Sequence, residues 1–195
     1  EPGFTLGERA ETIDKQEDGS FIVTSNKGKR FHAAVVAIAG GLGSFEPRKP
    51  LIDGIDFYED KGIKYFIKNP EKFRDKKVVI AGGGDSALDW SIFLSNIASE
   101  VTLVHRRNEF RGALDSVDKV QELKNAGKIR LITPAEVIGI NGAEHIESVV
   151  LEENGATRTI ETDYFIPLFG LTPKLRPIGD WGLEIEKNAI KVNNA

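Results

Sequence analysis

An α/β fold with a parallel sheet is predicted by three features of this sequence. Residues 78–81 form an apolar run, which is typical of a strand buried on both faces. That run stops at three consecutive glycines, residues 82–84, and continues into a segment with helical spacing of apolar residues. A second apolar run follows at residues 101–104. Strand, glycine turn, helix and strand in this order are typical of a Rossmann-like dinucleotide-binding unit.

Residues of the glycine turn have separate expected roles. Gly82 supplies the tight turn, and Gly84 lets the backbone approach a pyrophosphate closely. Ala87 is small enough for the helix to pack against the strand. Asp85 or Ser86 is expected to cap the helix. The helix N-terminus would then offer free N–H groups and a positive dipole end to a phosphate.

Basic residues follow the second strand, where an NAD site carries an acidic residue for the ribose hydroxyls. His105, Arg106 and Arg107 stand there, and Arg111 follows one turn later. Guanidinium groups bind a 2′-phosphate through charge-assisted hydrogen bonds, so the pattern favours NADPH over NADH. Two alternatives stay open: a solvated basic turn, and a glycine turn that serves a flavin, S-adenosylmethionine or no ligand.

Composition and charge exclude several classes of protein. The chain has 195 residues, of which 40% are hydrophobic and 29% are charged, as is ordinary for a soluble globular protein. A net charge of −4 argues against general nucleic-acid binding. No apolar run is long enough to span a membrane and no signal peptide is visible, so we expect a cytoplasmic location without membrane contact.

Metal and thiol chemistry are not expected in this chain. It contains no cysteine, which excludes disulfides and thiolate metal sites within this stretch. His32, His105 and His145 lack metal-ligand spacing, so no metal site is predicted. The chain also lacks methionine, so we expect a piece of a longer polypeptide or a processed one.

The first fifty residues predict a β-ribbon that leads into a buried strand. Residues 9–15 and 20–25 alternate like strands around turn residues 17–19. Residues 33–39 are apolar and predict the buried strand. Residues 45–50 predict a proline-stiffened linker.

The later residues repeat this order. A short strand and turn are predicted over residues 63–70, before the glycine turn. Beyond that turn the pattern predicts a helix over 117–126, a strand over 129–132, a ribbon of strands 136–140 and 146–152, and an apolar segment over 164–170. The repetition indicates two related dinucleotide-binding domains, the first without its glycine turn; the alternative is two ribbons by coincidence.

The chain resembles the two-domain flavoprotein reductases of the thioredoxin reductase type. Within that group it is most similar to the thioredoxin-reductase-like ferredoxin (flavodoxin) NADP reductases. Four motifs carry the resemblance, at residues 40–49, 82–90, 105–111 and 177–185. The resemblance implies the two-dinucleotide-binding-domain flavoprotein fold, with a three-layer domain of parallel sheet, helices and β-ribbon.

Domain roles follow from the same resemblance. Residues 1–46 would be a partial FAD-binding domain, residues 47–172 the NADPH-binding domain, and residues 173–195 the start of the returning FAD-domain segment. NADPH would pass a hydride to FAD, and electrons would continue to an iron-sulfur or flavin carrier, ferredoxin or flavodoxin. Because the cofactors carry the redox chemistry, no catalytic residue is named. A homodimer is implied for the full-length protein.

Two other functions remain open at this point. One is the NADPH domain of another FAD-dependent pyridine-nucleotide reductase with a different acceptor. The other is a non-catalytic NADPH-binding module. Since the FAD glycine turn and the last flavin-contacting segment are missing from this stretch, we expect the fragment alone to be colourless and inactive.

Site residues complete the expectations. NADPH contacts are expected at Gly82, Gly83, Gly84, Asp85, Ser86, Ala87, His105, Arg106, Arg107, Arg111 and Gly170. The resemblance implies that Ala10, through its backbone, and Phe45 contact FAD in the intact enzyme. Thioredoxin reductases carry a Cys-x-x-Cys that aligns near Tyr65 to Lys68. These residues are not cysteines, so thiol-disulfide exchange is excluded there.

Overall fold

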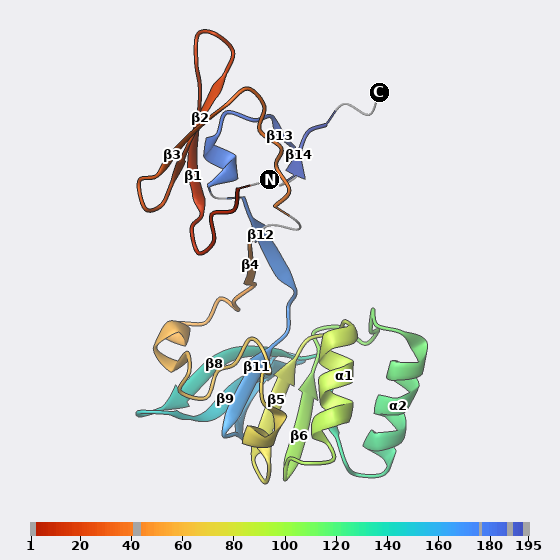
Figure 1. Cartoon of the computed structure of the whole chain (residues 1–195). Coiled ribbons are helices and arrows are strands. Elements are labelled where there is room, and N and C mark those ends of the chain that lie inside the picture. Colours follow the sequence, from red (N-terminus) through yellow and green to blue (C-terminus); the bar gives the residue numbers. More distant parts are fainter. Residues whose placement is uncertain (1–2, 41–43, 176, 187–188, 193–195) are drawn as a thin grey trace. The chain divides into compact units, whose positions relative to one another are not determined.

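The structure is a computed structural model that describes residues 3–40, 44–175, 177–186 and 189–192. The chain divides into two compact units (Figure 1). One is the continuous segment Pro47–Gly170, and the other combines Glu1–Glu46 with Leu171–Ala195. Within the described ranges, no helix is long and apolar enough to cross a membrane.

A parallel sheet forms the centre of the unit Pro47–Gly170, with strand order β11-β5-β6-β7. Its strands are β5 (Lys77–Ala81), β6 (Glu100–Val104), β7 (Arg130–Ile132) and β11 (Tyr164–Pro167). In the register of the sheet, Ile80 lies between Leu103 and Ile166, and all three are fully buried. The apolar runs in the sequence therefore do form buried parallel strands, as predicted.

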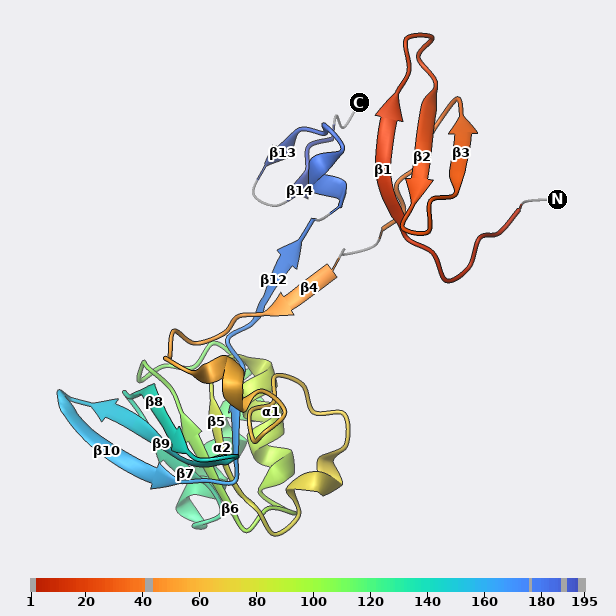
Figure 2. The same cartoon turned by 90° about the vertical axis from the view of Figure 1, so that its left-hand side faces the viewer.

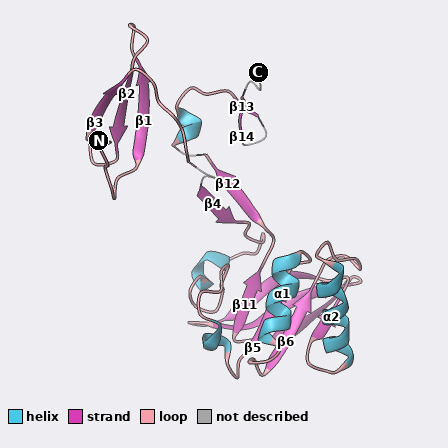
Figure 3. Cartoon of the chain, turned by 45° about the vertical axis from the view of Figure 1, so that its right-hand side comes forward, coloured by secondary structure: helices cyan, strands magenta, loops and turns pink. Residues whose placement is uncertain are grey.

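Two helices cover one face of this sheet (Figure 3). They are α1 (Asp85–Leu94) and α2 (Leu114–Asn125). Val78 and Ile80 of β5 point to this face and share a core with Leu88 of α1 and Val120 of α2. The alternation of side chains along a strand sends the intervening residues to the opposite face.

An antiparallel ribbon covers that opposite face. Its strands are β8 (Glu136–Gly142), β9 (Ile146–Glu153) and β10 (Ala156–Glu161), in the order β10-β9-β8. Val79 and Phe165 of the parallel sheet share a core with Val149 and Leu151 of β9. The predicted three layers of helices, parallel sheet and ribbon are confirmed. The third ribbon strand, β10, was not predicted.

The expected helix cap is wrong. The N-cap of α1 is Gly84, no side chain caps the helix, and Asp85 is the first helical residue. The Asp85 carboxylate instead accepts a hydrogen bond from the backbone N–H of Ala113 at 2.7 Å, immediately before α2. Asp85 therefore ties the starts of the two helices together, and a contact over this sequence separation has no local signature.

The predicted strand over residues 63–70 is also wrong. Ile63 makes only isolated bridges, to Glu59 and Phe165, and the segment is otherwise irregular. Two short 3-10 helices flank it, η1 (Ile55–Tyr58) and η2 (Pro70–Phe73). Ile63 is 1% exposed and belongs to the core under the ribbon, so its apolar character reflects burial of one side chain rather than strand pairing.

The second unit is built from short antiparallel strands (Figure 2). They are β1 (Ala10–Lys15), β2 (Phe21–Ser25) and β3 (Arg30–Ala33), the pair β4 (Ser44–Pro47) and β12 (Leu171–Lys174), and the pair β13 (Ile185–Glu186) and β14 (Ala189–Ile190). A 3-10 helix, η3 (Ile178–Asp180), precedes Trp181, whose indole donates a hydrogen bond to the Glu11 carbonyl at 3.0 Å. The predicted opening ribbon is confirmed.

Two expectations in this unit need correction. Residues 34–40 are irregular, and Val35 is 80% exposed, so the predicted buried strand over 33–39 is wrong beyond Ala33. An apolar strand is buried only between neighbours on both sides, and the described residues of this unit give residues 34–40 none. The predicted linker over 45–50 begins as strand β4, and residues 41–43 of the preceding motif lie outside the described residues.

Candidate functional site

The site begins where β5 ends, at the glycine turn. A Cβ on Gly82 would lie 2.7 Å from the Leu168 carbonyl oxygen and 2.9 Å from the Ala87 Cβ. A Cβ on Gly83 would overlap the imidazole ring of His105. The first two glycines are therefore required by the packing of the chain itself, and the fully buried Ala87 lets the helix approach as predicted.

The packing of the chain does not require glycine at residue 84. A Cβ there would meet no atom within 4 Å. Its backbone, at φ −102° and ψ 179°, is extended and open to any residue type. Neither packing nor backbone geometry thus demands glycine at this position, and close approach of a ligand stays the predicted role of its absent side chain.

Free backbone amides surround this open space. In the part of the chain that the structure describes, the N–H groups of Gly83, Gly84, Asp85 and Ser86 donate to no acceptor, and no side chain caps the helix. The first amides of a helix lack intrahelical partners and sit at its positive dipole end. Successive free N–H groups at a helix start suit an anion such as a diphosphate.

A basic loop is fastened to the turn. We define the arginine loop as residues 105–111. The Arg111 N–H donates to the Gly83 carbonyl at 2.7 Å, which fixes the far end of this loop against the turn. Arg106, Arg107 and Arg111 are exposed, and no ion pair of theirs occurs among the described residues. Three guanidinium groups are therefore available to an anionic ligand.

His105 differs from its basic neighbours because it is buried, with 7% of its surface exposed. Its ring stacks on that of Phe110 at a centroid distance of 5.2 Å, and its Nε2 lies 3.1 Å from the Glu109 carbonyl oxygen. Burial lowers the pKa of His105 below its ordinary value; the hydrogen bond to Glu109 opposes this, and the charge of Arg106 adds to it. The imidazole is therefore neutral at pH 7.

A cavity of about 480 Å³ opens beside the turn and the arginine loop. Five of the predicted nucleotide residues line it: Gly82, Gly83, His105, Arg106 and Arg111. Six others do not line it: Gly84, Asp85, Ser86, Ala87, Arg107 and Gly170. The cavity thus joins the glycine turn to two of the three arginines.

Sequence reasoning missed most of the remaining walls. Apart from the acidic Glu136 they are apolar or basic, and apart from Ala81 and Val104 they come from other segments of the unit: Arg48, Lys49, Pro50, Leu51, Ala81, Val104, Ala135, Glu136, Val137, Ile138, Leu168 and Phe169. Arg48 and Lys49 lie within the motif at residues 40–49, and this motif was the sequence signal that could have placed them at the cavity. Cationic and apolar walls together suit an elongated ligand that carries phosphates and rings.

The expected flavin contacts lie in the other unit. Ala10 begins β1, and Phe45 belongs to β4, but the side chain of Phe45 lies outside the described residues. A fit to flavin at these positions therefore stays a prediction.

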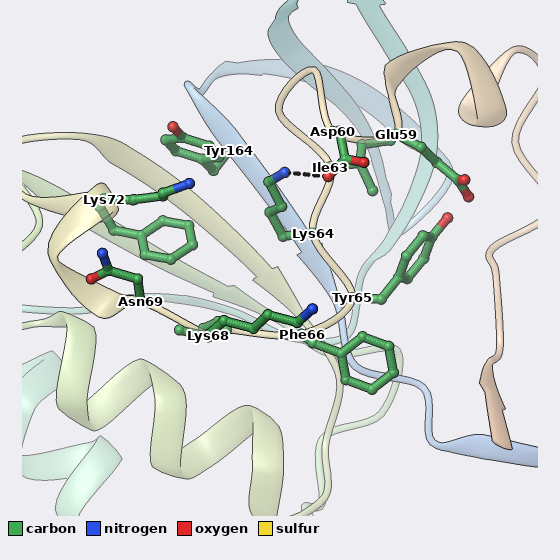
Figure 4. A pocket seen from close by; sticks show the side chains of 12 residues that line it. Glu59, Asp60, Ile63, Lys64, Tyr65, Phe66, Lys68, Asn69, Lys72 and Tyr164 are labelled. Atoms are coloured by element: carbon green, nitrogen blue, oxygen red, sulfur yellow. Dashed lines mark hydrogen bonds and ion pairs between the residues drawn. The ribbon is translucent and has the colours of Figure 1, made fainter. Parts of the chain in front are cut away.

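A second cavity, of about 340 Å³, lies at residues 59–73 beside β11 (Figure 4). Its lining includes the segment from Tyr65 to Lys68, where the resemblance to thioredoxin reductases places their cysteines. Burial, followed by the nearby Glu59 carboxylate, raises the pKa of Tyr65 to about 12. The amine of Lys64 is ion-paired with Asp60 at 2.6 Å.

Across the described ranges, no group of His, Cys, Asp and Glu could hold a metal ion.

Comparisons with known proteins show the family and the fold of the chain. Residues 3–195 match the family described as pyridine nucleotide-disulphide oxidoreductase. A relative named ferredoxin–NADP reductase, from Flavobacterium johnsoniae, is 87% identical over 195 residues, and the match covers 100% of this chain and 56% of the relative. A relative of the same name from Flavobacterium psychrophilum is 76% identical over 196 residues, with 100% and 56% covered. The chain therefore spans about half the length of the curated relatives it matches.

Solved structures show the same fold. The crystal structure of T. acidophilum thioredoxin reductase aligns with a TM-score of 0.80 and 25% sequence identity. The alignment covers 96% of this chain and 60% of that one. The fold is thus thioredoxin-reductase-like.

Proposed function

The chain belongs to the pyridine nucleotide-disulphide oxidoreductase family, and we propose that it is the NADPH-binding part of an FAD-dependent ferredoxin or flavodoxin NADP oxidoreductase. The name ferredoxin–NADP reductase, carried by the two similar Flavobacterium proteins, supports the electron carrier. The absence of cysteine supports an acceptor other than a disulfide reduced through a thiol pair of this chain. The NADPH-binding role falls to the unit Pro47–Gly170, and FAD would be held with the help of Ala10 and Phe45 in the other.

One observation carries this proposal: the open space at Gly84 borders free amides, and the cavity beside that turn is lined by Arg106 and Arg111. Amides at a helix start fit the diphosphate of a dinucleotide. Guanidinium groups fit an additional phosphate monoester, which NADPH carries and NADH lacks.

When bound, NADPH would supply a hydride to FAD, and the single electrons would pass on to ferredoxin or flavodoxin. The residues of this chain bind and orient the nucleotide. Gly82 and Gly83 keep the turn tight, the amides from Gly83 to Ser86 hold the diphosphate, and the arginine loop holds the 2′-phosphate. His105 is neutral, so the chain does not rely on it as a proton donor at pH 7.

The test is a nucleotide titration of the 195-residue chain by calorimetry. We expect NADPH to bind tighter than NADH by at least about tenfold, since one charge-assisted hydrogen bond contributes about 1.5–3 kcal/mol. The same preference for 2′,5′-ADP over 5′-AMP would locate the discrimination at the 2′-phosphate. Equal affinities for NADPH and NADH would contradict the proposed site.

The electron acceptor needs the whole protein. The chain extended by the flanking sequences of its relatives, purified with FAD, should reduce ferredoxin or flavodoxin with NADPH. Tight NADPH binding without transfer to either carrier would favour a reductase with another acceptor. A whole protein that binds NADPH but retains no flavin would favour a non-catalytic binding module.

A further inference from the structure

We propose that His105 is a positioning residue: its ring fills the space over Gly83 and holds the arginine loop where Arg106 and Arg111 line the cavity. This inference rests on the proposed NADPH site and adds the element that sets its preference for the phosphorylated nucleotide. His105 was predicted from the sequence to contact NADPH directly; its surroundings point to a different task.

The ring of His105 touches both parts that must meet. On one side it occupies the position that a Cβ of residue 83 would take, so it lies directly on the backbone of the glycine turn. On the other it stacks on Phe110 and approaches the Glu109 carbonyl at 3.1 Å, both within the arginine loop. One side chain thus bridges the glycine turn and the segment that precedes Arg111.

The backbone of His105 is itself anchored. Its N–H donates to the Ile132 carbonyl at 3.2 Å, and its carbonyl accepts from the Ala135 N–H at 2.9 Å. The ring therefore projects from a fixed point beyond the end of the parallel sheet. Together with the bond from the Arg111 N–H to the Gly83 carbonyl at 2.7 Å, this closes the loop at both of its ends.

The chemistry of imidazole suits this place better than other side chains. A flat ring can lie on a glycine backbone, while its Nε2–H can donate to the Glu109 carbonyl, which a phenyl ring cannot do. The ring is neutral because it is buried, so it adds no further charge beside Arg106 and Arg111. Without the ring, the loop would keep the hydrogen bond from the Arg111 N–H to the Gly83 carbonyl, but it would lose the packing of His105 on the turn and on Phe110 that fixes the path from residue 105 to Arg111.

A double-mutant cycle on the 195-residue chain tests this, with NADPH and NADH affinities as readouts and thermal unfolding as the check of folding. We expect His105→Ala to weaken NADPH by about tenfold, the loss of one charge-assisted hydrogen bond, and to change NADH by less than about twofold. Gly83→Ala should lower the NADPH affinity by a similar factor, because its methyl group displaces the ring; the comparison with NADH is made for His105→Ala alone, since the Gly83 amide also belongs to the proposed diphosphate site. In the double variant the methyl group enters the vacated space, so its loss should be no greater than that of either single variant.

Rescue by a conservative change separates positioning from general damage. His105→Gln keeps a donor for the Glu109 carbonyl and should recover part of the preference for NADPH, whereas His105→Ala should not. Losses of NADPH affinity in the two single variants that add in the double variant would overturn the proposal, as would equal losses for NADPH and NADH in His105→Ala. If the unaltered chain itself fails to distinguish NADPH from NADH, the proposed function fails first. If it distinguishes them and His105→Ala still does, only the positioning role fails.

Discussion

Replacing Gly84 by serine should make the protein more stable and a poorer nucleotide binder. Residue 84 is the N-cap of α1, its backbone is extended, and a Cβ at this position would meet no atom within 4 Å. A serine there can accept a hydrogen bond from the Ser86 N–H, and it restricts the unfolded chain. These two effects should raise the free energy of unfolding by about 0.5–1 kcal/mol.

Binding should change in the opposite direction. The serine oxygen would take the Ser86 amide that is otherwise free, and its Cβ would fill space beside the amides of Gly83 and Gly84. Loss of one hydrogen bond to a charged phosphate is worth about 1.5–3 kcal/mol. The NADPH affinity should therefore fall by at least about tenfold, and NADH should fall equally because both nucleotides carry the diphosphate.

Urea unfolding and calorimetric titration measure the two effects on the same sample. Gly3→Ser is a matched control, since a Cβ at Gly3 also meets nothing within 4 Å and Gly3 lies in the other unit. It should leave nucleotide affinity unchanged. A folded Gly84→Ser protein that binds NADPH as tightly as the unaltered chain would refute the argument that glycine is present there for the ligand.

Three further predictions concern the same region. Arg106→Ala and Arg111→Ala should each lower the NADPH affinity measured by calorimetry by at least about tenfold and leave the NADH affinity nearly unchanged. Arg107 lies outside the cavity lining, so Arg107→Ala should change both affinities little. Equal effects of all three substitutions would show that lining the cavity does not decide which arginine binds the nucleotide. Gly82→Ala should lower the free energy of unfolding by about 1–3 kcal/mol in urea, because its methyl group would meet a carbonyl oxygen at 2.7 Å; an unchanged midpoint would contradict that packing. The pKa of His105 is lowered in the folded state, so the unfolded chain binds the proton more readily. The free energy of unfolding should therefore fall as the pH drops below about 6.5 toward that lowered pKa. His105→Gln should reduce the change of this free energy with pH between pH 8 and 5, and an identical pH dependence would assign it to other groups.

Local patterns in the sequence were sufficient for the parallel sheet and the turn. The apolar runs before Gly82 and before His105 predict buried strands because each residue of such a strand faces a covering layer. The glycines and Ala87 predict the turn because backbone approach depends on residue size alone. Asn154 and Gly155, which both have positive φ, form the turn between β9 and β10. An Asn-Gly pair is typical of a tight hairpin turn, so the sequence does hold a local signal for the unpredicted strand β10.

Other features depend on contacts that no local pattern encodes. Aspartate is a residue type that often caps helices, but the Asp85 carboxylate accepts a hydrogen bond from the Ala113 N–H, which only the packing of two helices brings near. Val35 and its neighbours are apolar enough for a buried strand, yet a strand needs partners. Leu51 and Phe169, which both line the cavity, lie near the first and the last residue of the unit Pro47–Gly170. Their place in one cavity wall therefore follows from the topology of the unit rather than from their spacing in the sequence.

The two ends of the unit Pro47–Gly170 meet. The Arg48 N–H donates to the Gly170 carbonyl at 3.0 Å, and β4, which leads into the unit, pairs with β12, which leaves it. An insertion with touching ends can be exchanged or removed while the host chain keeps its path, because a short turn can replace it. The entire unit Pro47–Gly170 therefore occupies the place of a hairpin loop between β4 and β12, and the closure entropy of such a loop grows only slowly with its length. Modularity of this kind lets one unit of the chain change in sequence and length while the path of the other stays the same.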